Sequence, residues 1–145
     1  MPGQIVAVCI SERKGEKKTP VDGVELRPNY GVVGDAHAGD WHRQVSLLAT
    51  ESIHKMQQMG LDVEAGDFGE NISTSGIDLV SLAVGTRLKS REVLLEITQI
   101  GKECHTRCSI YHQAGDCVMP KEGIFAKVLK GDHIKAGDAV VVVND

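Results

Sequence analysis

Short apolar runs separated by glycine-containing turns are the feature that most limits how this chain can fold. The runs cover residues 5–10, 77–82, 86–89, 92–97, 123–129 and 138–143. Many short strands with closely spaced turns are typical of a β-barrel or sandwich. Aromatic residues make up only 3% of the chain, so the core must consist mainly of Val, Ile, Leu and Ala, which suits strands. With 145 residues the chain has the size of one domain, and we expect a mainly β fold over residues 1–145.

Residues 50–59 form the clearest predicted helix, and we expect one or two short helices in all. Thr50 can serve as the N-cap, Glu51 suits the positive end of the helix dipole, and Gly60 can adopt the left-handed conformation that ends a helix. Ile53 and Met56 have helical spacing and are expected to pack into the core.

The balance of charge excludes some classes of function. With 16 basic and 20 acidic side chains the net charge is −4, which argues against broad binding to nucleic acid or to an anionic membrane surface. No signal peptide is evident, and no apolar run approaches the roughly 18 to 20 residues that span a bilayer. We therefore expect a cytoplasmic protein that binds neither nucleic acid nor membranes. A local basic pocket for a small anion is compatible with this charge.

Three of the four cysteines lie in one polar stretch, residues 103–117. In the cytosol, clustered cysteines more often bind metals, catalyse reactions or change redox state than form structural disulfides. Their spacing with a histidine supplies four ligands that suit tetrahedral zinc, namely Cys104, Cys108, His112 and Cys117. Structural zinc sites usually have two tight ligand pairs separated by a longer loop, whereas these four ligands fall in one short run. The fourth cysteine, Cys9, lies inside an apolar strand and is expected to be buried.

Cys104 has the strongest case for a reactive thiol. Lys102, His105 and Arg107 lie close to it in the sequence, and positive charge near a thiol favours the thiolate. A catalytic Cys/His pair would also need a histidine within hydrogen-bond distance, which adjacency in sequence does not guarantee. No local signature of a thiol protease is present.

Two glycine-rich segments, residues 31–46 and 64–72, are predicted to be loops that carry functional groups. His37 lies in the first segment and could equally be a turn residue bonded to backbone. Arg43 follows it and can hold a phosphate while backbone amides cover the other oxygens. In the second segment Glu70 and Asn71 offer a carboxylate and an amide beside a glycine, which suits recognition of a heterocycle edge. Glu70 could also be a solvated turn residue.

Several segments together resemble the MOSC domain family, a module found at the carboxyl end of molybdenum cofactor sulfurases and in small stand-alone bacterial proteins. The similar residues are Gly-Asp-Ala-His-Ala-Gly at 34–39, Arg-Gln-Val-Ser at 43–46, Gly-Asp-Phe-Gly-Glu-Asn-Ile at 66–72, Val-Gly-Thr at 84–86, Leu-Glu-Ile-Thr-Gln at 95–99, Cys104 and residues 123–131. Their order and combined length make the resemblance specific. It implies a MOSC-type β-barrel.

The resemblance also implies a cofactor and a role for one cysteine. The family's reactive cysteine falls on Cys104, and Cys108 occupies a nearby place that some relatives use in a Cys-x-x-Cys arrangement; this chain has Cys-x-x-x-Cys instead. The thiolate would carry sulfur or coordinate the molybdenum of the pterin-based cofactor, because soft ligands suit such a metal. The residues expected to hold the cofactor are His37, Arg43, Glu70, Asn71, Lys102 and Arg107.

The resemblance implies that such a protein acts in cofactor sulfur transfer or in reduction of N-hydroxylated compounds, with a sulfur-donor or electron-donor protein as partner. The chain lacks the large domain in which a sulfurase binds pyridoxal phosphate, so it is not expected to extract sulfur from cysteine by that route. Two other hypotheses remain open. One is a non-enzymatic module with the zinc site described above, and the other is a thiol switch in which Cys104 pairs reversibly with Cys108 or Cys117.

Overall fold

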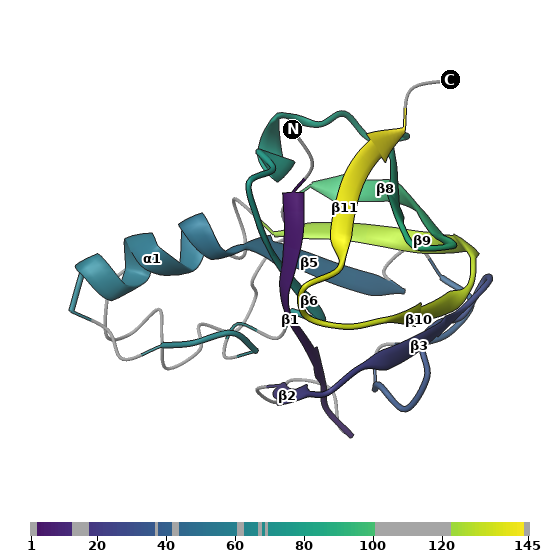
Figure 1. Cartoon of the computed structure of the whole chain (residues 1–145), viewed down its shortest axis with the longest axis horizontal. Helices are drawn as coiled ribbons and strands as arrows, with labels where there is room; N and C mark the ends of the chain where they lie inside the picture. The colour runs from purple at the N-terminus through teal and green to yellow at the C-terminus, as the bar shows by residue number, and fades with distance from the viewer. Residues whose placement is uncertain are drawn as a thin grey trace.

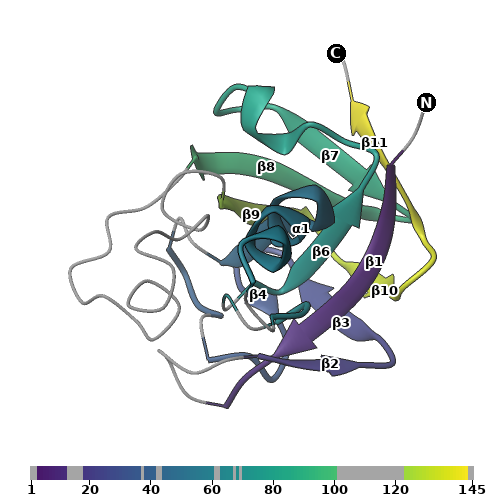
Figure 2. The ribbon, with the colours of Figure 1, turned by 90° about the vertical axis from the view of Figure 1, so that its left-hand side faces the viewer.

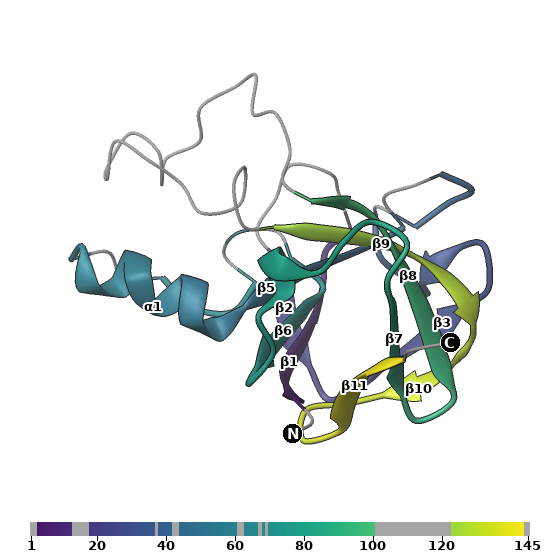
Figure 3. The ribbon, with the colours of Figure 1, turned by 90° about the horizontal axis from the view of Figure 1, so that it is seen from above.

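The structure of this chain is a computed structural model, and it describes residues 3–12, 18–36, 38–41, 44–60, 63–66, 68, 70–100 and 123–143. Seven strands form a closed barrel in which the pairing of β1 with β11 completes the ring (Figures 1 and 3). In their order around the barrel they are β11 (Ala139–Val143), β7 (Arg87–Ser90), β8 (Val93–Ile100), β9 (Ile124–Lys130), β5 (Val45–Ala49), β6 (Ile72–Ser75) and β1 (Gly3–Ile10). The predicted mainly β, barrel-like fold is therefore confirmed.

Four further strands extend this barrel. β2 (Thr19–Val21) pairs with the far end of β1, so it lengthens the sheet beyond the ring. A separate three-stranded sheet has the order β10 (Asp132–Ile134), β3 (Val24–Arg27) and β4 (Gly31–Val32). Its buried side chains belong to the same core as those of the barrel, namely Val24, Leu26, Val32 and Ile134. The small sheet therefore packs against the barrel and does not form a core of its own.

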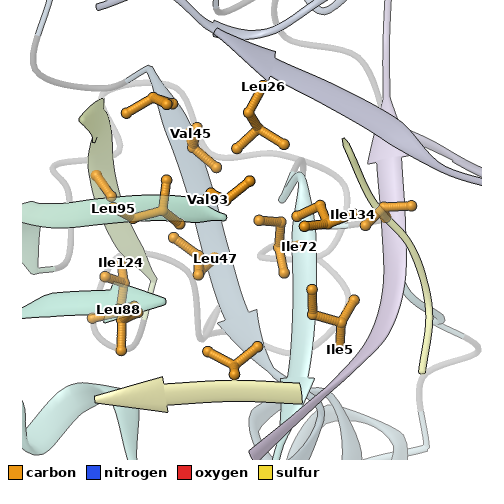
Figure 4. Close-up of a cluster of buried hydrophobic side chains, with 14 of the residues drawn as sticks. Ile5, Leu26, Val45, Leu47, Ile72, Leu88, Val93, Leu95, Ile124 and Ile134 are labelled. Atoms are coloured by element: carbon orange, nitrogen blue, oxygen red, sulfur yellow. The ribbon is translucent and has the colours of Figure 1, made fainter. Parts of the chain in front are cut away.

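The barrel is filled by aliphatic side chains that point inward from its strands (Figure 4). Ile5, Leu47 and Ile72 come from three neighbouring strands, and each is at most 2% exposed. Side chains alternate along β8 of the β7–β8 hairpin, since Val93, Leu95 and Ile97 are buried between half-buried neighbours. As the low aromatic content implies, the interior consists almost entirely of Val, Ile, Leu and Ala.

Helix α1 (Thr50–Gln58) follows β5 directly and projects outward from the barrel (Figure 1), so Figure 2 shows it end-on. Ile53 and Met56 are buried as predicted, in a second cluster with Leu48, Val63, Phe68 and Phe125. Gly60 adopts a φ of 92°, which confirms the predicted left-handed helix end. The predicted N-cap is wrong by one residue: Ala49 is the N-cap, and the Thr50 hydroxyl donates to the carbonyl of Thr74 at 3.0 Å.

The sequence misplaced some elements. The apolar run 77–82 contains the short 3-10 helix η1 (Leu79–Ser81) and no strand, because its backbone forms local hydrogen bonds from Ser81 to Asp78 and from Leu82 to Leu79. Two barrel strands, β5 and β6, were not predicted: each begins in the last residues of a segment predicted to be a loop and continues into residues to which no element was assigned. All five residues of β5 are buried because the barrel core covers one face of the strand while α1 and its neighbours cover the other.

No helix in the described parts of the chain has the length and apolar character needed to cross a bilayer.

The packing of the barrel leads to the first prediction. Leu47 is 1% exposed and pairs with both neighbouring strands, so Leu47→Ala should lower the free energy of unfolding by roughly 2 to 5 kcal/mol. Val84 is 61% exposed, and Val84→Ala should change it by less than about 0.5 kcal/mol. Urea unfolding followed by circular dichroism measures both. Equal effects of the two substitutions would contradict the proposed core.

Candidate functional site

Buried polar side chains gather where the two glycine-rich segments approach the barrel. Each of these residues is less than a tenth exposed, and together they are called the polar cluster: Ser11, Lys18, Asp35, Ser46, Glu70, Asn71 and Ser73. Burying polar groups is unfavourable unless they form hydrogen bonds, so such a cluster needs a defined geometry. Sequence reasoning found only Glu70 and Asn71 of this set as candidate site residues.

Asn71 connects three strands of the barrel. Its Oδ1 accepts hydrogen bonds from the Ser46 backbone N–H at 3.0 Å and from the Ser46 hydroxyl at 3.2 Å. Its Nδ2 donates to the carbonyl oxygen of Cys9 at 3.1 Å, and its own carbonyl accepts from the Cys9 N–H at 2.7 Å. The amide therefore joins the start of β6 to β5 and to β1. This satisfies the Asn71 side chain within the protein and fixes where the preceding loop ends.

Lys18 and Asp35 form an ion pair that is fully buried. Lys18 Nζ lies 2.7 Å from Asp35 Oδ1, and both side chains have 0% exposure. The same ammonium group donates to the Ser11 hydroxyl at 3.1 Å, and the Ser11 N–H donates to Asp35 Oδ1 at 3.0 Å. Burial by itself would raise the pKa of Asp35. The hydrogen bonds from Lys18 and Ser11, the charge of Lys18 and a hydrogen bond from Asn71 outweigh burial and hold that pKa below its usual value.

Glu70 is 0% exposed and uses only one of its carboxyl oxygens in the described network. Oε2 accepts from the Gly66 N–H at 2.9 Å and from the Ser73 hydroxyl at 3.0 Å. Within the part of the chain that the structure describes, Oε1 has no hydrogen-bond partner. Burial raises the pKa of Glu70 despite the hydrogen bonds to Oε2 that lower it. The solvated turn that the sequence left open for Glu70 is therefore wrong.

Gly66 has a conformation and a position that only glycine fits. Its φ is 93°, and a Cβ atom at this residue would lie 2.1 Å from the carbonyl oxygen of Lys18 and 3.3 Å from Cys9 Sγ. The Gly66 carbonyl accepts from the Lys18 N–H at 2.8 Å. The second glycine-rich segment is thus held tightly against residue 18 and against the buried Cys9, as predicted for that cysteine.

The strand pairing sets Ile100 and the start of β9, the described parts on either side of residues 101–122, in register with β5 and β6. Ile100 pairs with Ile124, which pairs with Leu47, and Leu47 pairs with Ile72. These four residues form one row across β8, β9, β5 and β6. Leu47 and Ile72 directly follow Ser46 and Asn71 of the polar cluster. The row therefore places Ile124 beside Leu47, the residue after Ser46, and places Ile100 one strand further away on β8.

Only two of the predicted site residues can be placed. Glu70 and Asn71 lie together at the start of β6, as described above. The others lie outside the described residues: His37, Arg43, Lys102, Cys104, Arg107, Cys108, His112 and Cys117. Their roles, and the zinc set among them, stay predictions. Among the described residues no group of three or more His, Cys, Asp or Glu side chains is arranged to hold a metal ion.

A groove elsewhere on the surface does not belong to this site. Its volume is about 430 Å³, and it lies between the start of α1 and the turn that follows β6, lined in part by Glu51, Lys55 and Asp78. It shares no residue with the polar cluster. The Glu51 carboxylate already accepts the Gly76 N–H there at 3.0 Å.

Comparison with known proteins agrees with this architecture. The family model of the MOSC domain matches residues 34–141, which is more than half of the chain. The chain belongs to the MOSC domain family. The matched region begins just before Asp35 and includes every barrel strand except β1 and the end of β11, so the polar cluster lies largely within it. The family is associated with the molybdenum cofactor.

Solved structures share the fold of this MOSC protein at low sequence identity. The YuaD protein from Bacillus subtilis has a TM-score of 0.80 at 19% identity, with 97% of this chain and 94% of that chain covered. YiiM from Geobacillus stearothermophilus has a TM-score of 0.72 at 22% identity, covering 99% and 76%. YiiM from Escherichia coli has a TM-score of 0.70 at 18% identity, covering 100% and 71%. No curated protein sequence matches the chain.

The desolvated carboxyl of Glu70 leads to a prediction about pH. A carboxyl with a raised pKa keeps its proton to higher pH in the folded than in the unfolded protein. Its contribution to the free energy of unfolding is therefore full below pH 4.5 and is lost as the pH rises through the raised pKa. Glu70→Gln keeps the shape and removes the titration. The variant should therefore gain stability relative to the wild type as the pH rises from 4.5 toward 8, as urea unfolding would measure.

The control for this prediction is Glu92→Gln, which neutralises an exposed carboxyl and should show no comparable gain. A Glu70→Gln variant that loses stability relative to the wild type over the same pH range would contradict the raised pKa of Glu70.

Proposed function

We propose that this MOSC protein binds the molybdenum cofactor with Cys104 as the thiolate that meets the metal or carries sulfur. The cofactor would serve either sulfur transfer or the reduction of N-hydroxylated compounds. The family match supports the cofactor class. The observation that carries the proposal is the row from Ile100 through Ile124 and Leu47 to Ile72, because it sets the described residues on either side of the cysteine segment in line with the residues that follow Ser46 and Asn71.

The polar cluster supports the fit of a pterin-based group. Glu70 has a buried carboxyl oxygen, Oε1, that no described residue pairs with, and a buried polar atom of this kind is unfavourable without a partner. A carboxyl group accepts hydrogen bonds and, in its protonated form, also donates one, so it has the groups needed to pair with the edge of a heterocycle. The amide of Asn71 is already satisfied within the protein, so we propose that it holds the loop in place from beneath the ligand.

The other residues would contribute charge and orientation. A terminal phosphate on the cofactor needs basic donors, and Arg43, Lys102 and Arg107 would supply them. His37 would contact the pterin from the first glycine-rich segment. The cofactor supplies two-electron redox chemistry at a metal that accepts soft ligands, which is why a thiolate is the expected protein ligand. Cys108 and Cys117 are the second choices for that thiolate.

Either activity needs a second protein. A thiolate that passes on sulfur must first receive it, and a metal centre that reduces a substrate must be supplied with electrons. We therefore propose a sulfur-donor or electron-donor protein as partner, in the cytoplasm.

Metal analysis of the four cysteine variants tests the proposal. In protein from a host that makes the cofactor, Cys104→Ser should lower bound molybdenum by at least about tenfold, because a metal centre that loses a ligand loses affinity. Cys9→Ala is the matched control, since this thiol is buried in β1 and the variant should keep its molybdenum. Cys108→Ser and Cys117→Ser show whether a neighbouring thiol takes the role.

Three results would contradict the proposal. The first is wild-type protein without molybdenum, and the second is equal molybdenum in the Cys104→Ser and Cys9→Ala variants. The third is one zinc ion per chain that is lost together with the fold on chelation, which would support the zinc module.

A further inference from the structure

Lys18 contacts three segments that lie far apart in the sequence. Its ammonium group contacts Asp35 in the first glycine-rich segment and Ser11 at the end of β1. Its backbone N–H donates to Gly66 in the second glycine-rich segment, and its carbonyl oxygen fills the space that a Gly66 side chain would need. One residue therefore joins both loops that border the candidate site.

Hydrogen bonds connect Gly66 in turn to the candidate site residues. The Gly66 N–H donates to Glu70, which also accepts from Ser73 on β6. On the other side of Lys18, Asp35 receives a hydrogen bond from Asn71. Lys18 is thus connected through one intermediate residue to Glu70 in one direction and to Asn71 in the other.

Stability alone does not account for an ion pair at this depth. Removing both charges from water is costly, and a buried pair replaced by apolar residues of similar size often leaves a protein equally stable or more so. A pair in which one partner is removed leaves an uncompensated buried charge, which is strongly destabilising. Unlike apolar residues, the ion pair is a directional contact. The 2.7 Å distance between Lys18 Nζ and Asp35 Oδ1 fixes one arrangement of the two loops.

We propose that Lys18 is a positioning residue of the site: paired with Asp35, it sets the first glycine-rich segment at a fixed place relative to the second. This role adds a positioning residue to the proposed function. It depends on the proposed function only for the identity of the ligand. The loop geometry itself can be measured without any ligand. The geometry predicts that the pair is more important for where the loop lies than for whether the protein folds.

Trp41 provides a spectroscopic probe of this loop. It is the only tryptophan of the chain, and it is half-buried in the same segment as Asp35. The backbone N–H of Trp41 donates to the Gly39 carbonyl at 3.0 Å, and the Gly39 N–H donates to the Tyr30 carbonyl at 2.6 Å. Its fluorescence therefore reports the environment of the first glycine-rich segment and not that of the barrel core.

The test uses the single variants Lys18→Met and Asp35→Leu and the double variant that combines them. Each single variant should melt roughly 10 °C below the wild type, because one buried charge loses its partner. The double variant should melt closer to the wild type than either single variant. Its Trp41 emission should nevertheless shift to longer wavelength, with stronger quenching by acrylamide, because the loop is no longer held in one position.

The matched control removes an ion pair that is exposed. Lys127 Nζ lies 3.4 Å from Glu96 Oε2 between β9 and β8, with side chains 44% and 25% exposed. The double variant Lys127→Met with Glu96→Leu should leave Trp41 emission and quenching as in the wild type.

Two outcomes would overturn the proposal. A Lys18→Met, Asp35→Leu protein that regains stability and keeps the wild-type Trp41 signal would show that the loop keeps its place without the pair. A double variant as unstable as the single variants would show that the pair maintains the fold itself. Molybdenum content of the same proteins tests the ligand separately: a wild type without molybdenum contradicts the proposed function and leaves the Trp41 comparison valid.

Discussion

The pairing of β1 with β11 is the interaction on which the rest of the structure depends. Gly3 pairs with Val140 and Gln4 with Ala139, and this short contact turns an open sheet into a closed ring. A closed barrel has no free edge within the ring and buries one continuous core without large aromatic residues. Closure gives β11 a second neighbour and completes the ring. Within the sheet β5 and β6 lie between β9 and β1, so the segments that precede these two strands end at fixed points on the barrel wall.

The candidate site follows from the direction of β5 and β6. These two strands are parallel, so both begin at the same end of the barrel and the two glycine-rich segments that lead into them meet there. Their meeting point is buried, where a polar group without a hydrogen-bond partner is unfavourable. Asn71 and the ion pair of Lys18 with Asp35 are held there by directional contacts, and such a network holds one loop arrangement where an apolar interface would allow several. The barrel thus positions the loops, and the polar cluster orients them.

The sequence predicted those features that depend on local pattern. The strands in the apolar runs 86–89 and 92–97, the helix with Ile53 and Met56 and the buried Cys9 were all visible because their burial follows from neighbours in the chain. The strand β5 was missed because it is buried on both faces and shows no alternation, and the run 77–82 was misjudged because its composition suits a strand while its hydrogen bonds are local. Lys18 could not be found, since a lysine in a charged segment normally lies in solvent. Its burial depends on Asp35 and Gly66, which only tertiary structure brings near. Glu70 and Asn71 were found because an amide and a carboxyl beside glycine suggest binding, and their role toward a ligand stays a prediction.

We propose that the barrel and its polar cluster position Cys104 to coordinate molybdenum. Molybdenum K-edge X-ray absorption of the cofactor-loaded protein tests it most directly, because the method counts the sulfur neighbours of the metal. If Cys104 is the ligand, we expect one protein thiolate in addition to the two dithiolene sulfurs in the wild type and in Cys9→Ala. This thiolate should be absent in Cys104→Ser. Identical sulfur coordination in the wild type and in Cys104→Ser would contradict it.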